Sequence, residues 1–251
     1  MATRITATRR DDGILVLQIS CPERRNILDE ASYAQMLEVL DRAEADDGVK
    51  VLIITGTDNC FTAGNDLENY RALADADSVA AVGFLRRLHA FPKPAIAAAE
   101  GIAMGLGVSI VLHCDFAYAG QSIRFQLPFS RFALSPLGAT TLLLPRLAGP
   151  KAASQLLLLG NAFSAREAQE IGLVTDTAPD GRALEQALDC AARLLARPYE
   201  ALLATKALMR EGQAAAVEEA LDREERTLLE RCRSPEAQRA IDAFFASRGR
   251  L

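Results

Sequence analysis

Tryptophan is missing from this sequence of 251 residues, and histidine occurs only twice. The five cysteines form no Cys-x-x-Cys pair and no cluster with histidine, so we expect reduced thiols and no metal site. Acidic residues outnumber basic ones, and no basic stripe is present, which argues against binding to nucleic acid. The longest apolar run, residues 102–112, is too short to cross a bilayer, and no signal peptide is expected at the start. These absences favour a cytoplasmic protein without a nucleic-acid or membrane partner.

What is present is an ordinary globular composition, with half of the residues apolar and about a quarter charged. A chain of this length forms one large domain, or one domain with a helical appendage. Apolar runs typical of buried strands alternate with segments of helical periodicity. We expect strands at residues 13–20, 51–55, 95–99 and 115–119, a helix that Asp29 caps, and a second helix over residues 105–113. This alternation predicts an α/β fold.

Strand signals end near Arg182, and the rest of the sequence predicts four helical segments with breaks near Pro198, Gly212 and Pro235. Ile241, Phe244 and Phe245 would share one face of the last segment, which then has to pack on the core or on another subunit. We therefore predict a core over residues 1–195 and a helical oligomerisation region over residues 196–251.

Two glycine-containing loops follow predicted strands, and each can present unpaired main-chain N–H groups. The first is FTAGNDL at residues 61–67, and the second is EGIAMGLGVS at residues 100–109, where a helix begins. Either loop alone is more typical of a tight turn. Two such donors that converge on one carbonyl oxygen would stabilise an enolate or a tetrahedral oxyanion.

The order of these motifs, with Lys93-Pro94 and Cys114-Asp115 around the second loop, resembles the crotonase superfamily, also called the enoyl-CoA hydratase/isomerase family. Further similar segments are PERRNIL at residues 22–28 and the long run at residues 125–149. The resemblance implies a spiral of ββα turns, a C-terminal helical region used for trimerisation, and a homotrimer or a dimer of trimers. It also implies an acyl-CoA substrate, with coenzyme A as its only cofactor-like part.

The same resemblance implies the site residues. The oxyanion donors would be the main-chain N–H groups of Ala63 and Leu106. Residues expected to contact coenzyme A or the acyl group are Arg24, Arg25, Ile27, Ala63, Asn65, Asp66, Leu67, Tyr70, Leu106, Phe129 and Leu137. One of the two arginines would meet a phosphate, and Asp66 is expected to be a loop or helix-cap residue rather than a base. Lys206 matches a family lysine, with simple exposure as the alternative.

The sequence departs from the family at the carboxylates. Hydratases of this family use two glutamates, and their positions hold Ser109 and Phe129 here. The local sequence is most similar to peroxisomal-type Δ3,Δ2-enoyl-CoA isomerases, in which the catalytic acid follows a Ser-Pro pair. In this sequence Leu137 follows Ser135-Pro136. Efficient hydration is therefore not expected, because serine cannot supply acid–base help near neutral pH.

Three hypotheses follow. The first is an acyl-CoA enzyme with isomerase-like enolate chemistry, whose base is unidentified. The second is a protein with reduced catalysis that serves as an acyl-CoA binding or assembly subunit. The third is a thioester hydrolase built on Ser109 and His113, which are four residues apart on one predicted helix. Side chains with that spacing in an apolar helix more often pack in the core.

Overall fold

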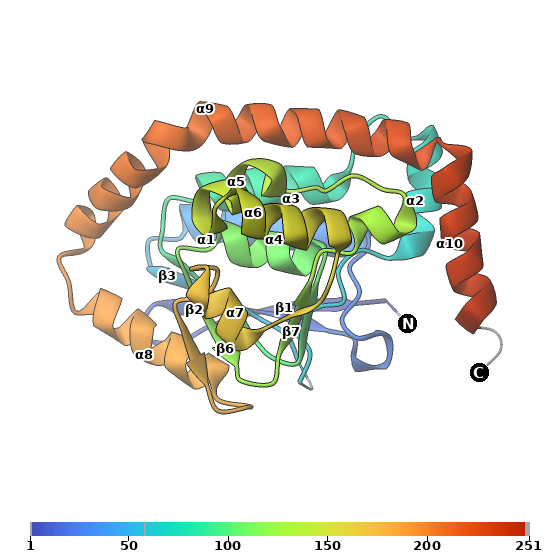
Figure 1. Cartoon of the computed structure of the whole chain (residues 1–251). Helices are drawn as coiled ribbons and strands as arrows, with labels where there is room; N and C mark the ends of the chain where they lie inside the picture. Colours follow the sequence, from blue (N-terminus) through green and yellow to red (C-terminus); the bar gives the residue numbers. More distant parts are fainter. Residues whose placement is uncertain (1, 58, 249–251) are drawn as a thin grey trace.

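A computed structural model describes residues 2–57 and 59–248 (Figure 1). Its larger sheet has six strands in the order β1-β2-β3-β4-β6-β9, and a smaller sheet joins β5, β7 and β8. The strands are β1 (Arg4–Arg9), β2 (Ile14–Ser20), β3 (Val51–Thr55), β4 (Ala95–Ala99), β5 (Ile102–Met104), β6 (Phe116–Gly120), β7 (Arg124–Gln126), β8 (Phe163–Ser164) and β9 (Asp176–Ala178).

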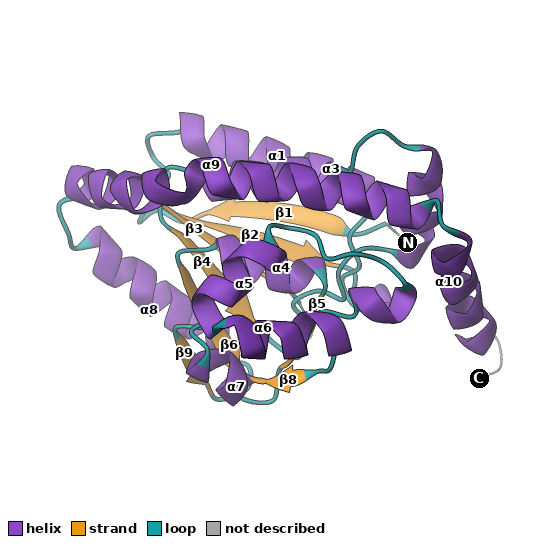
Figure 2. Cartoon of the chain, turned by 45° about the horizontal axis from the view of Figure 1, so that its top comes forward, coloured by secondary structure: helices purple, strands orange, loops and turns teal. Residues whose placement is uncertain are grey.

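Helices cover both faces of the larger sheet (Figure 2). They are α1 (Glu30–Ala45), α2 (Leu67–Ala72), α3 (Ala80–Ala90), α4 (Leu106–His113), α5 (Thr140–Ala148), α6 (Pro150–Ser154), α7 (Ala165–Glu170), α8 (Ala183–Leu195), α9 (Tyr199–Cys232) and α10 (Pro235–Arg248). Short helical turns η1 (Pro22–Arg24), η2 (Leu73–Asp75), η3 (Phe129–Phe132) and η4 (Gln155–Leu159) lie between them. The α/β class predicted from the sequence is confirmed.

The larger sheet is parallel from β2 to β9, and only β1 runs antiparallel to its neighbour. Every residue of β3 and β4 is buried, because α8 covers one face of the sheet while α1, α3 and α4 cover the other. The carboxyl ends of parallel strands share one edge, so the loops after β3 and β4 come together there. These loops are the two glycine-containing segments found in the sequence.

Most predicted core elements are confirmed within one or two residues. The Asp29 side chain caps α1 as expected and accepts a hydrogen bond from the N–H of Ser32 at 2.9 Å. Strand β1 was not predicted, because its sequence RITATR is largely exposed and lacks an apolar run. Antiparallel pairing with β2 holds this segment as a strand, although its own composition does not favour one.

The predicted helix break near Gly212 is wrong, because α9 is one continuous helix of 34 residues that includes Gly212. Gly212 is exposed and its helical conformation is unstrained, so the glycine costs about 1 kcal/mol of helix propensity and no more. Burial of Val217, Leu221 and Leu228 on the same helix outweighs that cost. The predicted division after residue 195 falls at the end of α8, and the side chains of α9 and α10 join the main hydrophobic core.

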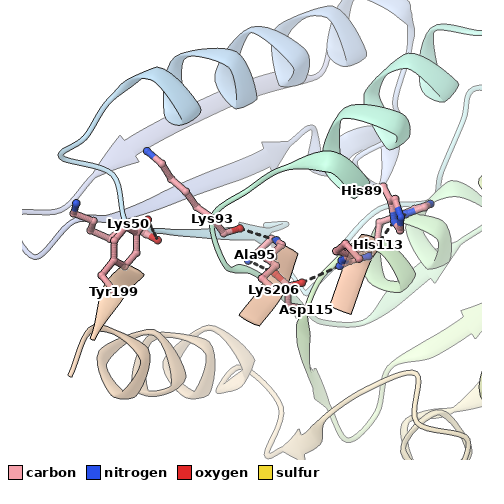
Figure 3. A network of polar contacts seen from close by, with 9 residues as sticks. Lys50, His89, Lys93, Ala95, His113, Asp115, Tyr199 and Lys206 are labelled. Carbon is pink, nitrogen blue, oxygen red and sulfur yellow. Dashed lines mark hydrogen bonds and ion pairs between the residues drawn. The ribbon is translucent and has the colours of Figure 1, made fainter. Parts of the chain in front are cut away.

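A buried polar network fixes α9 to the sheet (Figure 3). The ammonium of Lys206 donates to the carbonyl of Lys93 at 2.7 Å and to Asp115 Oδ2 at 2.6 Å, and Arg210 pairs with Asp115 Oδ1 at 2.8 Å. Lys206 is only 8 % exposed, so the alternative of a simple surface lysine is wrong, and burial lowers the pKa of its ammonium. Asp115 also accepts from the N–H of Ala95, which joins α9 to the starts of β4 and β6.

Within the described residues, no helix combines the length and apolarity that a membrane span requires. All five cysteines carry free thiols, as predicted from their spacing.

Candidate active site

A cavity of about 520 Å³ opens beside the two glycine-containing loops. It is lined by Glu23, Arg24, Arg25, Ile27, Ala63, Asn65, Asp66, Leu67, Glu68, Tyr70, Met104, Gly105, Pro128, Phe129, Phe132, Leu134, Phe244 and Phe245. Nine of the eleven predicted contact residues belong to this lining. Segments far apart in the sequence thus form one site, as the shared edge of parallel strands requires.

Asn26 attaches the arginine-containing segment to the first glycine loop. It is fully buried, with a left-handed φ of 53°; its Oδ1 accepts from the N–H of Cys21 at 2.6 Å, and its Nδ2 donates to the carbonyl of Cys60 at 2.7 Å. The sequence analysis did not single out this residue. Buried polar side chains that satisfy main-chain groups of two segments keep those segments in register.

The N–H of Ala63 is already hydrogen bonded, because it donates to the carbonyl of Arg25 at 2.9 Å. An N–H held by a carbonyl cannot hold a ligand oxygen without losing that bond. In this structure Ala63 is therefore not available for the donor role predicted from the sequence.

The main-chain N–H of Asn65, unlike that of Ala63, points away from the segment of residues 25–28. The carbonyl of Gly64 accepts from the N–H of Leu28 at 2.8 Å, and the N–H of Asp66 donates back to the carbonyl of Leu28 at 3.0 Å. In such a parallel bridge between Leu28 and Asn65, the N–H of Asn65 itself points to the other side. No acceptor for it is found in the described part of the chain, and Asn65 lines the cavity.

Leu106 supplies a second unpaired N–H, because it is the first residue of α4 and its amide precedes the first helical hydrogen bonds. No hydrogen-bond acceptor for the N–H of Leu106 is found within residues 2–57 and 59–248. Its side chain is 1 % exposed and lies in the core outside the cavity lining, so its main chain is the part that can act. The helix dipole adds partial positive charge at this amide.

Gly64 allows the two donor segments to touch. Its φ is +81°, and a Cβ at this position would lie 2.5 Å from the carbonyl oxygen of Met104 and 3.5 Å from the nitrogen of Leu106. Only glycine fits this approach without displacing the neighbouring backbone. The unpaired N–H groups of Asn65 and Leu106 thus belong to segments in direct contact.

Leu137 is the other predicted contact residue that lies outside the cavity lining. It is fully buried, and its carbonyl accepts a hydrogen bond from the hydroxyl of Ser109 at 2.9 Å. Phe129 does line the cavity. Ser109, Phe129 and Leu137 are the three positions at which the sequence analysis expected family carboxylates to be replaced. Ser109 and Leu137 are enclosed in the core, and Phe129 presents an aromatic ring to the cavity.

Ser109 and His113 do not form a nucleophile–base pair. Ser109 donates to Leu137, whereas Nε2 of His113 lies 3.0 Å from the carbonyl of Gly138 and its Nδ1 lies 3.2 Å from His89. Burial lowers the pKa of His113 to about 3 and that of His89 to about 4. Both rings are structural groups in the interior, which removes the geometric basis of the hydrolase hypothesis.

Asp66 caps α2, in agreement with the loop or helix-cap role expected from the sequence. Its carboxylate accepts from the N–H of Glu68 at 3.1 Å and pairs with Arg24 at the cavity wall. The hydrogen bond that the Arg24 guanidinium donates to Asp66 raises the pKa of Arg24. Arg25 lines the same wall with an exposed side chain. Two guanidinium groups thus stand on this wall of the cavity, and guanidinium groups can bind phosphate oxygens.

Tyr70 is a buried polar residue of the lining. Burial raises the pKa of its phenol, an effect that the neighbouring Asn65 side chain partly offsets. Phe132, Phe244 and Phe245 line the cavity as well, although the sequence analysis did not assign them to the site. The signal that could have found two of them was present, because Phe244 and Phe245 lie on the apolar face of the last helix.

Comparison with known proteins shows the family. The family model described as enoyl-CoA hydratase/isomerase matches residues 9–249. The chain belongs to the enoyl-CoA hydratase/isomerase family. It is 34% identical over 244 residues to a 2,3-dehydroadipyl-CoA hydratase and 32% identical over 247 residues to a 1,2-epoxyphenylacetyl-CoA isomerase, both of Escherichia coli K12; each alignment covers 95% of this chain and 94% of the relative.

The structure of Pseudomonas aeruginosa OdaA superposes with a TM-score of 0.92 at 36% identity and covers 96% of this chain and 98% of that one. The crotonase fold with a helical C-terminal region, expected from the sequence, is thereby confirmed. An enoyl-CoA hydratase/isomerase family member is an acyl-CoA-processing enzyme. Relatives named as hydratases and as isomerases both match, so family membership alone does not choose between the two reactions.

Proposed function

We propose that the cavity binds an acyl-CoA thioester and that the N–H groups of Asn65 and Leu106 hold its carbonyl oxygen while an enolate forms. Asn65 takes the place of Ala63 in this assignment. The observation that carries it is the pair of unpaired donors on segments in contact at Gly64. Donors that are positioned before reaction stabilise developing negative charge without reorganisation, and one such donor contributes about 3 kcal/mol.

The reaction that we propose is isomerase-like proton transfer rather than hydration. Hydration needs a water molecule held between acid–base groups. Ser109 is fully buried and hydrogen bonded to Leu137, and Phe129 fills the second position with a ring. These neighbours support chemistry on the thioester itself, in which a proton moves between carbons of the acyl group.

The carboxylates at the cavity stand at positions to which the resemblance assigned no acid–base role. Glu23 lies in η1 and Glu68 in the first turn of α2, and both line the cavity with exposed side chains. Asp66 is occupied by Arg24 and by the N–H of Glu68. Glu68, three residues after the Asn65 donor, is our candidate for the proton-transferring base. Glu23 is the control carboxylate, to which we assign no proton transfer.

Turnover tests this proposal. The purified protein is incubated with 3-enoyl-CoA, 2-enoyl-CoA and saturated acyl-CoA, while conjugation of the double bond and release of free thiol are both followed. We expect conjugation without thiol release. Thiol release would support the hydrolase, and binding of every thioester without conversion would support the alternative of a catalytically reduced acyl-CoA binding or assembly protein.

Two pairs of variants test the residues. Leu106→Pro removes the donor N–H at a helix position where proline is tolerated, whereas Leu106→Ala keeps it. We expect Leu106→Pro to be slower than Leu106→Ala by about a hundredfold or more. Equal rates would reject the donor. Glu68→Gln should lower turnover by about a hundredfold or more, and Glu23→Gln should not.

We also propose that the chain assembles as a homotrimer, alone or as a dimer of trimers. Large apolar side chains lie exposed on α9, α5 and η4: Leu208, Met209, Leu147, Leu158 and Leu159. Leu208 and Met209 are more than 70 % exposed in the isolated chain. Apolar residues of this kind on neighbouring helices are typical of a surface that another subunit covers.

A further inference from the structure

Part of the cavity wall is aromatic, and α10 supplies two of its rings. Phe244 meets Phe132 of η3 edge to face, with ring centroids 5.5 Å apart, and meets Phe245 in the same manner at 5.6 Å. All three rings line the cavity together with Phe129 and Leu134. Edge-to-face clusters of this kind accept a further apolar group through additional ring contacts.

Several contacts hold α10 at this place. Ala237 and Ile241 are fully buried on its inner face. Asp242 pairs with Arg71 of α2, and the Arg71 guanidinium lies over the Phe245 ring at 4.9 Å from its centroid. At the joint before α10, Arg233 donates to the carbonyl of Ala74 at 2.9 Å. The two phenylalanines therefore occupy defined positions in the wall.

Charge is distributed unequally around the cavity. Among the described residues that line it, the cations are Arg24 and Arg25, and Arg24 pairs with Asp66 at the N-terminal end of α2. The aromatic group packs near the other end of that helix, at Arg71, which is neutralised by Asp242 and does not belong to the lining. Glu23 and Glu68 add negative charges to the same lining. A carboxylate carried at the end of an acyl chain would meet no unpaired cation among the aromatic rings.

We infer that the substrate's acyl group is apolar to its end, without a terminal carboxylate, and that Phe244 and Phe245 of α10 select it. This inference rests on the proposed acyl-CoA function. The acyl end displaces water from the rings of Phe132, Phe244 and Phe245, while coenzyme A extends toward Arg24 and Arg25. Burial of a charged end against these rings is strongly unfavourable, because its hydration is lost without a partner.

Calorimetric binding of saturated thioesters to the full chain tests the inference without turnover. The ligands are free coenzyme A, acetyl-CoA, hexanoyl-CoA, phenylacetyl-CoA and adipyl-CoA, the last of which carries a terminal carboxylate. We expect hexanoyl-CoA and phenylacetyl-CoA to bind at least about tenfold more tightly than adipyl-CoA or acetyl-CoA. Adipyl-CoA that binds as tightly as hexanoyl-CoA would overturn the inference.

Variants of α10 test the selecting residues. Phe244→Ala and Phe245→Ala should each weaken hexanoyl-CoA and phenylacetyl-CoA by about tenfold while acetyl-CoA changes little. Phe245→Leu, which keeps an apolar side chain, should weaken phenylacetyl-CoA more than hexanoyl-CoA. Arg239→Ala, at an exposed position of the same helix, is the control and should change none of the affinities.

The two proposals fail differently in this experiment. If no thioester binds, and free coenzyme A does not bind either, the acyl-CoA function fails. If acetyl-CoA binds normally but the alanine variants weaken every thioester by the same factor, the selecting role of α10 fails while acyl-CoA binding stands.

Discussion

The hydroxyl of Ser109 donates to the main-chain carbonyl of Leu137 at 2.9 Å in the interior of the protein. This contact joins two of the positions at which the sequence analysis predicted that family carboxylates are replaced. Ser109 lies against Gly138 as well, where a Cβ would approach the Ser109 side chain to 2.6 Å. The space around Ser109 is therefore filled by the protein itself.

Ser109→Ala should consequently affect stability and leave chemistry unchanged. The buried carbonyl of Leu137 would lose its partner, which lowers the free energy of unfolding by about 1–3 kcal/mol. Chemical denaturation measures this loss, with Ser130→Ala at an exposed position as the control. Thioester turnover at an unchanged rate is expected. A rate reduced a hundredfold in a folded variant would reinstate Ser109 as a nucleophile.

Gly64→Ala should disturb the site and the fold together. The added methyl group would meet the Met104 carbonyl at 2.5 Å, in a backbone conformation with φ of +81° that alanine rarely adopts. We expect a loss of about 2–3 kcal/mol in stability and a marked loss of thioester binding.

Gly212→Ala is the matched control for this substitution. Nothing lies within 4 Å of a Cβ at Gly212 in α9, so alanine should raise the free energy of unfolding by about 0.5–1 kcal/mol. Thermal and denaturant unfolding of both variants, with calorimetric binding, separate the two cases. Similar effects of the two substitutions would contradict the close contact at Gly64.

The buried histidine pair predicts acid sensitivity. Burial lowers the folded-state pKa of His113 to about 3 and of His89 to about 4, from an ordinary value of 6.5. Below pH 6.5 the unfolded chain takes up protons that the folded chain does not, so stability falls toward pH 4 by up to about 1.4 kcal/mol per pH unit for each histidine. Above pH 7 this contribution is constant.

Denaturation of wild type and His113→Gln between pH 7 and 4.5 checks this slope. Carboxylates titrate in both proteins, so the difference between the two curves reports on His113. The variant should lose stability less steeply than wild type as the pH falls. Parallel curves would show that His113 does not remain neutral in the folded state.

Met209→Glu should separate subunits if the exposed apolar face of α9 is an interface. A charge in the centre of such a contact is desolvated without a partner. Light scattering after gel filtration should show the wild-type trimer and a smaller species for the variant. Arg226→Glu, which places a carboxylate at another exposed position of α9, should keep the wild-type mass. A monomeric wild-type protein would reject the interface.

The elements of the core could be predicted because their signals are local. Apolar runs mark β3 and β4, and helical periodicity with a cap residue marks α1. The two glycine loops were also found. Which N–H in the first loop is free could not be predicted, because the pairing of Ala63 and Asn65 is decided by residues 25–28, far away in the sequence.

Long-range packing explains the other differences. Gly212 lies in an uninterrupted α9 because the opposite face of the helix packs on the core. Lys206 is buried because Asp115, ninety-one residues earlier, provides its counter-charge. Phe244 and Phe245 enter the cavity only through the place where α10 docks on α2 and η3. The apolar face of the last helix indicated that Phe244 and Phe245 pack against something, but the neighbouring sequence does not indicate where, and it carries no pattern for the other two relationships.

The carbonyl of Arg25 also accepts a contact from the thiol of Cys60, at 3.2 Å, besides the N–H of Ala63. Hydrogen bonds thus connect the arginine segment directly to the loop that we propose binds the thioester. Their separation sets a required span between the phosphates and the thioester of any ligand that is to reach both. A thioester of pantetheine, which has no nucleotide, would engage the loop and leave both arginines unused, and its affinity relative to the coenzyme A ester measures how much that span contributes.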